Sequence, residues 1–276
     1  MNEVDKWADY LLVFDEIVRT RPFPYREYDQ IYMRAQSMVR QVEYLAPRIR
    51  GKNVAFLGDG DSICLMLALA HAYGLLADTF SSATVFDFDE RIIANIENVI
   101  HRCSLQESIN TSLYNVADPI DESFKGLFDC FYFNPPYGSK NAGQSCLMWL
   151  YRCSELCVNK CFGYIAMPGR DEAAWADEAI NTLELTAPTL GFEVSDDCSV
   201  RHGYHLDDNP DLHSTNLCLK REGSADHPYT GLNFPIEMAR KMYGNERDIP
   251  HYILLDQSNP CGRLDFDWIY GGERAT

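Results

Sequence analysis

The sequence predicts a doubly wound α/β fold with a mostly parallel sheet. From Gly51 onward, short apolar runs alternate with longer amphipathic stretches. The runs have strand length, and most of them end in glycine, aspartate or asparagine, as strands do where they enter a loop. Strands that alternate with helices at this spacing indicate βαβ units, and therefore a parallel sheet.

The expected elements follow in chain order. Residues 1–50 predict a helical extension, because Phe14 and Ile17 belong to an apolar series at helical spacing that stops at Pro22. We expect a second helix over 33–46, then strands at 54–57, 83–88, 112–116, 129–133 and 162–167, helices at 63–76, 89–100 and 145–158, and closing strands at 189–194 and 215–220. The α/β domain is then 51–222, and 223–276 is a C-terminal extension packed on it, whose elements the sequence does not define.

Composition and charge limit the kinds of function that are possible. The chain has 276 residues, 46% of them hydrophobic, which predicts one large folded domain rather than a disordered chain. Lys and Arg number 24 against 41 Asp and Glu, a net charge of −17. Such a surface repels phosphate backbones, so nucleic acid is disfavoured without being excluded, and a small cationic amine is attracted. The alternative is that the charge serves only solubility.

The chain start and the cysteines indicate the compartment. The first residues are acidic and carry no basic signal region, and the longest apolar stretch, 63–77, is too short to span a bilayer. We expect a cytoplasmic protein with reduced thiols and no membrane partner. Cys146, Cys153, Cys157 and Cys161 predict a buried thiol stripe rather than a metal site. Trp268 and Tyr270 in the tail could form an oligomer contact, so a homodimer stays open.

The loop after the first strand reads Gly58-Asp59-Gly60-Asp61. Its glycines let a backbone approach a ligand closely, and the following helix N-terminus adds N–H donors. Its two aspartates would repel a pyrophosphate, so the loop differs from the phosphate-binding Gly-x-Gly-x-x-Gly pattern. The loop favours a nucleoside that carries positive charge, such as a sulfonium, although Asp-Gly is also an ordinary turn.

Acidic side chains also follow the second and third strands. Asp87 ends the second strand, where a carboxylate can accept hydrogen bonds from both ribose hydroxyls. The alternative is that Asp87 only begins the next helix beside Asp89, which we expect to cap that helix. Asp118 follows the third strand and could accept a bond from the exocyclic amine of an adenine. Taken singly, each position also fits an ordinary turn.

The most specific motif is Asn134-Pro135-Pro136-Tyr137, after the fourth strand. Two prolines hold a turn whose carbonyls project forward, since neither residue has an N–H to engage them. The Asn134 side-chain oxygen and a prolyl carbonyl can hold an amino group whose nitrogen attacks an electrophile. Tyr137 can stack on the acceptor or contact its cationic part. The motif therefore predicts an amine-binding turn, with a purely structural turn as the alternative.

Together these residues resemble the Rossmann-like class I S-adenosylmethionine-dependent methyltransferase fold, with 134–137 matching its amino-methyltransferase motif. The order of four motifs is similar to that of the branched-chain polyamine synthases, the N4-bis(aminopropyl)spermidine synthases. The motifs are Glu27-Tyr28-Asp29-Gln30, Gly58-Asp59-Gly60-Asp61-Ser62, Asp87-Phe88-Asp89-Glu90-Arg91 and Asn134-Pro135-Pro136-Tyr137. Segment 204–212 resembles the late loop of that family, and the match covers most of residues 20–220.

The resemblance implies a transferase that moves an aminopropyl group from decarboxylated S-adenosylmethionine to a polyamine nitrogen, without a metal. It implies that Asp87 holds the ribose, Asp118 the adenine, and Asn134 with Pro135 the attacking nitrogen. The other donor-site residues are then Asp29 and Gln30, which close over the donor, and Gly58, Asp59 and Gly60. The substrate-binding residues are Asp61, Tyr137, His205, Asp207 and Asp208, with a proton acceptor among Asp59, Asp61, Asp207 and Asp208.

Two positions depart from that family. Its first loop carries three consecutive aspartates, whereas Gly60 replaces the middle one here, and its later motif begins with Asp, whereas Asn134 cannot take a proton. Both differences fit a second reading, an N-methyltransferase that uses S-adenosylmethionine itself. A third reading is an inactive subunit that binds a nucleoside or a polyamine. The family usually has a winged-helix-like N-terminal domain, whereas we expect only two helices before the sheet here.

Overall fold

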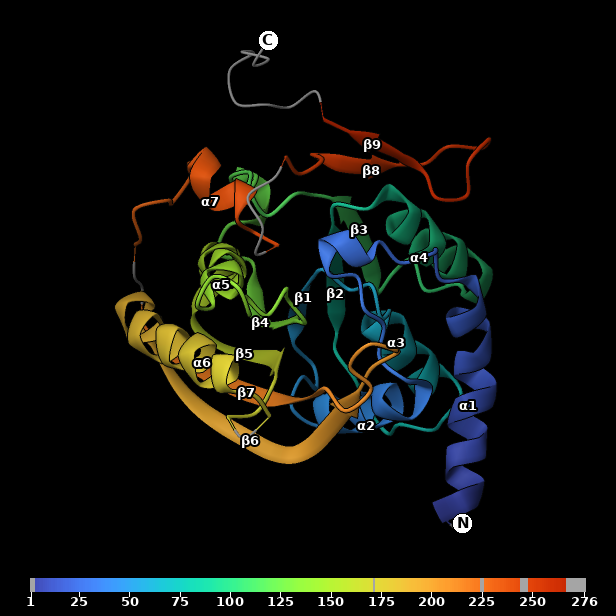
Figure 1. The fold of residues 1–276 in the computed structure, drawn as a ribbon. Coiled ribbons are helices and arrows are strands. Elements are labelled where there is room, and N and C mark those ends of the chain that lie inside the picture. Colours follow the sequence, from blue (N-terminus) through green and yellow to red (C-terminus); the bar gives the residue numbers. More distant parts are fainter. Residues whose placement is uncertain (1–2, 171, 224–225, 244–247, 267–276) are drawn as a thin grey trace.

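The computed structural model describes residues 3–170, 172–223, 226–243 and 248–266, and its centre is a seven-stranded sheet (Figure 1). The strand order is β3-β2-β1-β4-β5-β7-β6, and β7 runs antiparallel to both of its neighbours while the other pairs are parallel. This is the class I methyltransferase-like sheet, so the predicted fold class is confirmed. The strands are β1 (Asn53–Leu57), β2 (Ser82–Asp87), β3 (Ile109–Leu113), β4 (Phe128–Phe133), β5 (Cys157–Met167), β6 (Phe192–Gly203) and β7 (His213–Glu222).

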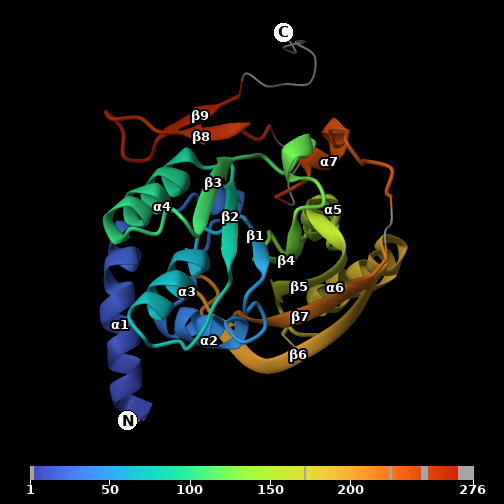
Figure 2. The same ribbon diagram turned by 180° about the vertical axis from the view of Figure 1, so that it is seen from behind.

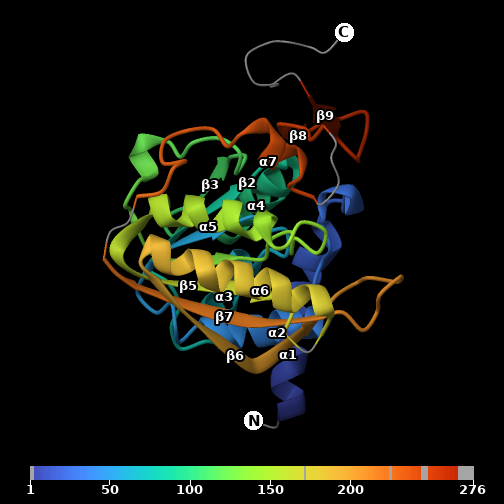
Figure 3. The same cartoon turned by 60° about the vertical axis from the view of Figure 1, so that its left-hand side comes forward.

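Helices cover both faces of the sheet (Figures 1 and 3). One layer holds α1 (Glu3–Thr20), α2 (Ala35–Leu45), α3 (Ile63–Ala72) and α4 (Glu90–Cys103); the other holds α5 (Gln144–Leu156) and α6 (Ala174–Thr186). Successive strand residues point to opposite faces, so Val54 and Phe56 pack in the core under α1–α4, and Ala55 and Leu57 in the core under α5 and α6. Burial on both faces explains why the strands read as continuous apolar runs.

The C-terminal segment returns to the end of β2. It contains α7 (Ile236–Arg240) and a hairpin of β8 (Tyr252–Leu254) and β9 (Arg263–Asp265), which lies beyond β2 and β3 in Figure 2. The Ile253 N–H donates to the carbonyl of Phe88, directly after β2, at 3.1 Å. Trp268 and Tyr270, which could form the oligomer contact, lie outside the described residues.

Several elements differ from those expected. The third strand lies three residues earlier than predicted, at Ile109–Leu113, because its polar Asn-Thr-Ser centre gives no apolar signal. The stretch 187–190, including part of the expected closing strand, forms the 3-10 helix η3 (Ala187–Leu190), which contains Pro188, and β6 begins only at Phe192. Helix α6 was not predicted. Short 3-10 turns η1 (Arg26–Tyr28) and η2 (Glu122–Phe124) complete the chain.

The predicted thiol stripe is confirmed. All four cysteines of the stripe are buried, with exposed fractions of 4% or less, and all four are free thiols. They pack in the core under α5 and α6. Among the described residues, no helix is long and apolar enough to cross a membrane.

One close approach in the sheet gives a stability test. A Cβ added at Gly163 would lie 2.0 Å from the ring of Phe131, which is fully buried and packs edge-on against Phe192. We expect Gly163→Ala to cost about 1–3 kcal/mol by overpacking, which lowers the melting temperature by about 2–4 °C per kcal/mol. Gly223→Ala is the control, since a Cβ there meets nothing within 4 Å. Equal melting temperatures for the two variants would contradict this packing.

Candidate active site

A cavity of about 290 Å³ opens at the carboxyl ends of the central strands. The neighbours β1 and β4 mark the point where the strand order reverses, because the chain leaves β1 toward β2 and leaves β4 toward β5. In open α/β sheets ligands bind at this switch point. The loops that follow four strands supply one wall, with residues 58–61, 87–88, 114–116 and 134–137.

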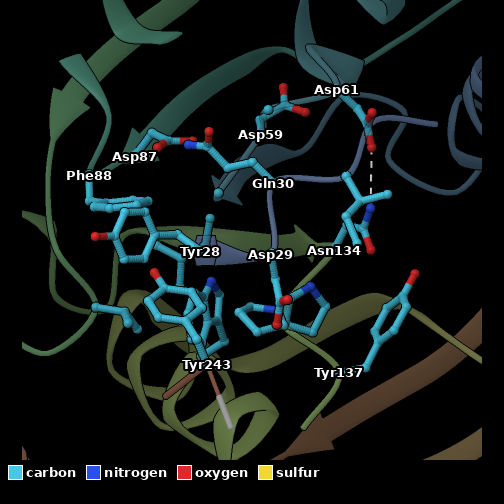
Figure 4. Close-up of a pocket in the computed structure, with 18 of the residues that line it drawn as sticks. Tyr28, Asp29, Gln30, Asp59, Asp61, Asp87, Phe88, Asn134, Tyr137 and Tyr243 are labelled. Carbon is cyan, nitrogen blue, oxygen red and sulfur yellow. Dashed lines mark hydrogen bonds between the residues drawn. The ribbon is translucent and has the colours of Figure 1, made fainter. Parts of the chain in front are cut away.

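Segments from both ends of the chain complete the cavity (Figure 4). The ring of Tyr28, in η1, packs edge-on against Tyr243 of the C-terminal segment at 5.4 Å and against Phe88 at 6.3 Å. Trp149 of α5 also lines the cavity. These rings give one end of the cavity flat apolar walls, which suit a nucleoside base.

Asp59 lines the cavity, but its carboxylate also caps a helix. Its Oδ1 accepts the N–H of Ile63 at 2.8 Å and its Oδ2 accepts the N–H of Cys64 at 2.9 Å, both at the start of α3. Burial raises the pKa of Asp59 well above its usual range, and the two N–H bonds only partly oppose that rise. Asp59 therefore anchors the loop after β1 to α3 while it presents acid to the cavity.

Asp61 is the acid nearest the turn formed by residues 134–137 after β4, here called the proline turn. Its Oδ1 accepts the N–H of Met33 at 2.7 Å and a longer bond from Arg21 at 3.4 Å. Its Oδ2 accepts the Asn134 side-chain amide at 3.2 Å (Figure 4). Burial raises the pKa of Asp61, and the Arg21 charge opposes that rise. The sequence placed Asp61 and Asn134 at the ends of two strands, and the structure brings them into contact.

Asp87 occupies the end of β2, as predicted. Its Oδ1 accepts the N–H of Asp89 at 2.9 Å, and only 5% of the residue is exposed. Burial, with the neighbouring Asp89 charge, raises the pKa of Asp87 to about 8. Asp89 is confirmed as the cap of α4, since its Oδ1 accepts the N–H of Arg91. Gln30, two residues after η1, donates to Asp89 Oδ2 at 2.8 Å.

The remaining predicted loop residues also line the cavity. Asp29 is exposed and holds a left-handed backbone at φ 54°. Gly58 also has a positive φ of 77°, and a Cβ there would lie 3.5 Å from the Trp149 indole nitrogen. At Gly60, where the resembling family has an acid, a Cβ would lie 3.4 Å from the Tyr32 ring.

The turn after β4 is enclosed by aromatic rings. Tyr137 stacks on Trp175 at 6.2 Å and packs edge-on against Tyr204 at 6.2 Å. The Tyr204 hydroxyl donates to the Asn134 side-chain oxygen at 3.4 Å. All four side chains, together with Pro135, line the cavity. The turn therefore faces the cavity, as an amine-binding turn requires.

Four predicted site residues are not brought to the cavity wall. Asp118 pairs instead with the His251 imidazole of the C-terminal segment at 2.6 Å, and the cavity contacts its neighbours 114–116. His205, Asp207 and Asp208 belong to the loop between β6 and β7, of which only Tyr204, Asn209 and Leu212 line the cavity. Asp208 forms an exposed ion pair with Arg26 at 2.9 Å.

Several lining residues were missed from the sequence. Tyr28 and Tyr204 lie inside the 27–30 and 204–212 motifs, so these motifs could have indicated them as site residues. Trp149, Trp175 and Tyr243 line the cavity from α5, α6 and the C-terminal segment, where no local pattern marks them. They reach the site only through long-range packing.

The cavity is lined by acids without cations. Asp29, Asp59, Asp61 and Asp87 contribute to its wall, and none of the described lining residues is Lys, Arg or His. Within the described residues, no group of three or more His, Cys, Asp or Glu side chains could hold a metal ion. The fold and this wall define the class: a methyltransferase-like chain with an acidic cavity at the switch point of its sheet.

Comparison with known proteins identifies the family. Residues 9–196 match the family of the branched-chain polyamine synthase A C-terminal domain, and the chain belongs to that family. This confirms the resemblance drawn from the motifs. N(4)-bis(aminopropyl)spermidine synthases from Methanocaldococcus jannaschii and Thermococcus kodakarensis are 28% and 29% identical over 132 and 136 residues.

These matches cover 47% and 49% of this chain but only 35% and 36% of the two relatives, so the shared region is about a third of their length. A crystal structure of the branched-chain polyamine synthase from Thermus thermophilus, in complex with N4-aminopropylspermidine and 5'-methylthioadenosine, has a similar fold. Its TM-score is 0.64 at 18% identity, covering 84% of this chain and 67% of that one.

The buried carboxyl of Asp87 gives a pH-dependent stability prediction. Its pKa is about 8 in the fold and about 4 in an unfolded chain. Between these values the folded protein holds a proton that the unfolded chain has lost, so stability falls as pH rises through this window. Asp87→Asn removes that cost, because an amide oxygen can still accept the Asp89 N–H. We expect its melting temperature to exceed the wild-type value by several degrees at pH 7 to 8.

The two melting curves should converge near pH 4, where Asp87 is protonated in both states. Asp78→Asn is the control, since Asp78 is an exposed acid in a surface ion pair with Arg50, and we expect no comparable gain. A melting temperature of Asp87→Asn at or below the wild-type value at pH 8 would refute the assignment of Asp87 as a destabilising buried acid.

Proposed function

We propose that the chain transfers an aminopropyl group from decarboxylated S-adenosylmethionine to the nitrogen of a small cationic polyamine. The observation that carries this proposal is the cavity wall: four aspartates and no described cationic side chain, beside a turn suited to hold an amine. A sulfonium donor and a polyamine both carry positive charge, which such a wall stabilises. Membership in the polyamine synthase family supports the same conclusion.

The wall also favours the decarboxylated donor over S-adenosylmethionine. The two donors differ by one carboxylate, on the group that leads toward the amine. A buried carboxylate needs a cation or several N–H donors, and the described cavity wall offers four aspartates and no cationic side chain. S-adenosylmethionine would therefore bury its carboxylate without a countercharge, whereas the decarboxylated donor has no carboxylate to bury.

The residues fit the two halves of the donor. Asp87 at the end of β2 would accept the ribose hydroxyls, and the rings of Tyr28, Phe88 and Tyr243 would enclose the adenosine end. Asn134 and the prolyl carbonyl of Pro135 would hold the attacking nitrogen. The donor then spans the cavity, with its sulfonium between the aromatic end and the proline turn.

The reaction is a direct displacement. The lone pair of the amine nitrogen forms a bond to the carbon attached to the sulfonium, the carbon–sulfur bond breaks, and its electron pair stays on sulfur. Methylthioadenosine leaves, and the nitrogen loses a proton. Aligning the two reactants is worth about 7–11 kcal/mol, so binding geometry supplies most of the catalysis. We assign this proton to Asp29, the exposed member of the four lining acids, which would pass it to water.

Methyl transfer is the competing function, and one observation favours it. Asn134-Pro135-Pro136-Tyr137 matches the amino-methyltransferase motif. The Asn134 oxygen can accept a hydrogen bond from an amine, but it cannot take the proton of that amine. The acid wall argues against it, because that donor keeps its carboxylate. The two reactions release different nucleosides, methylthioadenosine or S-adenosylhomocysteine.

The decisive experiment supplies each donor separately with a panel of linear polyamines and identifies the nucleoside by chromatography. We expect methylthioadenosine from the decarboxylated donor, together with an amine heavier by one aminopropyl unit. With S-adenosylmethionine we expect no turnover. Asp87→Asn should weaken methylthioadenosine binding at least tenfold, about 1.4 kcal/mol, and Asp78→Asn should leave it unchanged.

Release of S-adenosylhomocysteine would replace the proposal with methyl transfer. Tight binding of methylthioadenosine without turnover of any amine would assign the chain a binding role instead. Either result would overturn the aminopropyl assignment.

A further inference from the structure

A series of polar contacts runs from the N-terminal segment to the proline turn. It begins at Arg21, between α1 and η1, whose guanidinium donates to Asp61 Oδ1 at 3.4 Å. Asp61 Oδ2 accepts the Asn134 amide at 3.2 Å, and the Asn134 oxygen accepts the Tyr204 hydroxyl at 3.4 Å. Tyr204 also lies 2.6 Å from the Ser214 hydroxyl.

The order of donors and acceptors fixes the Asn134 carboxamide. Its nitrogen can only donate, and it faces a carboxylate that can only accept; its oxygen faces a hydroxyl that can donate. The flipped carboxamide would set an oxygen against the Asp61 carboxylate. Tyr204 uses one lone pair of the Asn134 oxygen, so the second lone pair remains for an amine N–H.

Arg21 is the cation in this series of polar contacts. Its side chain is 5% exposed and that of Asp61 is 6% exposed, so the pair is screened little by water. The guanidinium also stacks over the Tyr32 ring at 4.4 Å, which holds its plane, and Tyr32 lines the cavity. Arg21 itself does not line the cavity. It therefore acts on the site through Asp61.

We propose that Arg21 is a positioning residue for the amine transfer: it holds Asp61 as the acceptor that, with Tyr204, turns the Asn134 carbonyl toward the attacking nitrogen. This inference rests on the proposed function. It assigns the N-terminal segment a part in the chemistry, and it gives Asp61 the role of orienting Asn134 rather than of taking the proton.

The charge state of Asp61 is the measurable consequence. The charged and titratable groups around it are Arg21 and Tyr32 of the N-terminal segment, Asp59 of its own loop, Tyr132 of β4, Tyr137 of the turn after β4, and Tyr204 and His205 of the β6–β7 loop. Arg21 is its direct ion-pair partner, and burial lowers the pKa of His205. Without Arg21, burial raises the pKa of Asp61 with no ion pair to oppose the rise. The carboxyl then takes a proton at higher pH.

The test compares Arg21→Met and Arg21→Lys with wild type in steady-state assays across pH. We expect Arg21→Met to lower kcat on the order of 10²-fold, the cost of a misplaced reacting group, while KM for the donor and the affinity for methylthioadenosine change little. The acid limb of its kcat profile should also lie at higher pH than that of wild type. Arg21→Lys keeps a cation and should recover most of the activity. Arg19→Met, in an exposed pair with Asp15 at 2.9 Å, is the control and should match wild type.

A double-mutant cycle with Tyr204→Phe tests the coupling through Asn134, since both residues act on one carboxamide. We expect the two effects on kcat to be less than additive. The phenylalanine retains the ring packing against Tyr137.

Calorimetric binding of the polyamine, in the presence of methylthioadenosine, separates the two proposals. If wild type turns over no amine but binds it, and Arg21→Met weakens that binding while methylthioadenosine still binds, the proposed reaction fails and the positioning role stands. If Arg21→Met folds, binds both ligands and keeps the wild-type pH profile, the positioning role is overturned. Loss of methylthioadenosine binding in both Arg21 variants would also overturn it, because Arg21 would then hold the cavity as a whole.

Discussion

The structure depends on compensating several carboxylates that are buried at one edge of the sheet. Asp59, Asp61, Asp87 and Asp89 are each at most 5% exposed, and an unpaired charge in such surroundings costs several kcal/mol. Backbone N–H groups compensate Asp59 and Asp87, at the point where a strand gives way to a loop and a helix. Asp61 and Asp89 also pair with the guanidinium groups of Arg21 and Arg91.

The same requirement explains why the N-terminal segment packs across the cavity. Asp61 receives its N–H bond from Met33 and its countercharge from Arg21, and Asp89 receives an amide from Gln30. Without these three residues, two buried carboxylates would lose partners. The segment between α1 and α2 is thus both a wall of the cavity and part of the electrostatic balance that lets the cavity stay acidic. A cationic ligand adds to that balance, so binding and stability are linked.

The sequence predicted the parts of the site that strand ends determine, and it failed where contacts cross the chain. The positions of Asp59, Asp61, Asp87 and Asn134 follow from strand periodicity, since parallel strands bring their carboxyl ends to one edge. The contact of Asp118 with His251 joins residues 133 apart in sequence, and no local pattern encodes such a pair. The same holds for Tyr243, which reaches the cavity through a segment whose elements the sequence left undefined.

The two departures from the family fit their surroundings in this chain. Asn134 lies 3.2 Å from an Asp61 oxygen, so an acid there would set two carboxylates in contact and one of them would have to hold a proton. The amide replaces that conflict with a hydrogen bond and fixes its own orientation. At Gly60, the Tyr32 ring and Ile92 lie within 3.6 Å of the position a Cβ would take, so a larger side chain would have to displace them. The site has fewer acids beside the turn than the family pattern, and an amine held there must reach the turn already neutral or pass its proton to another group.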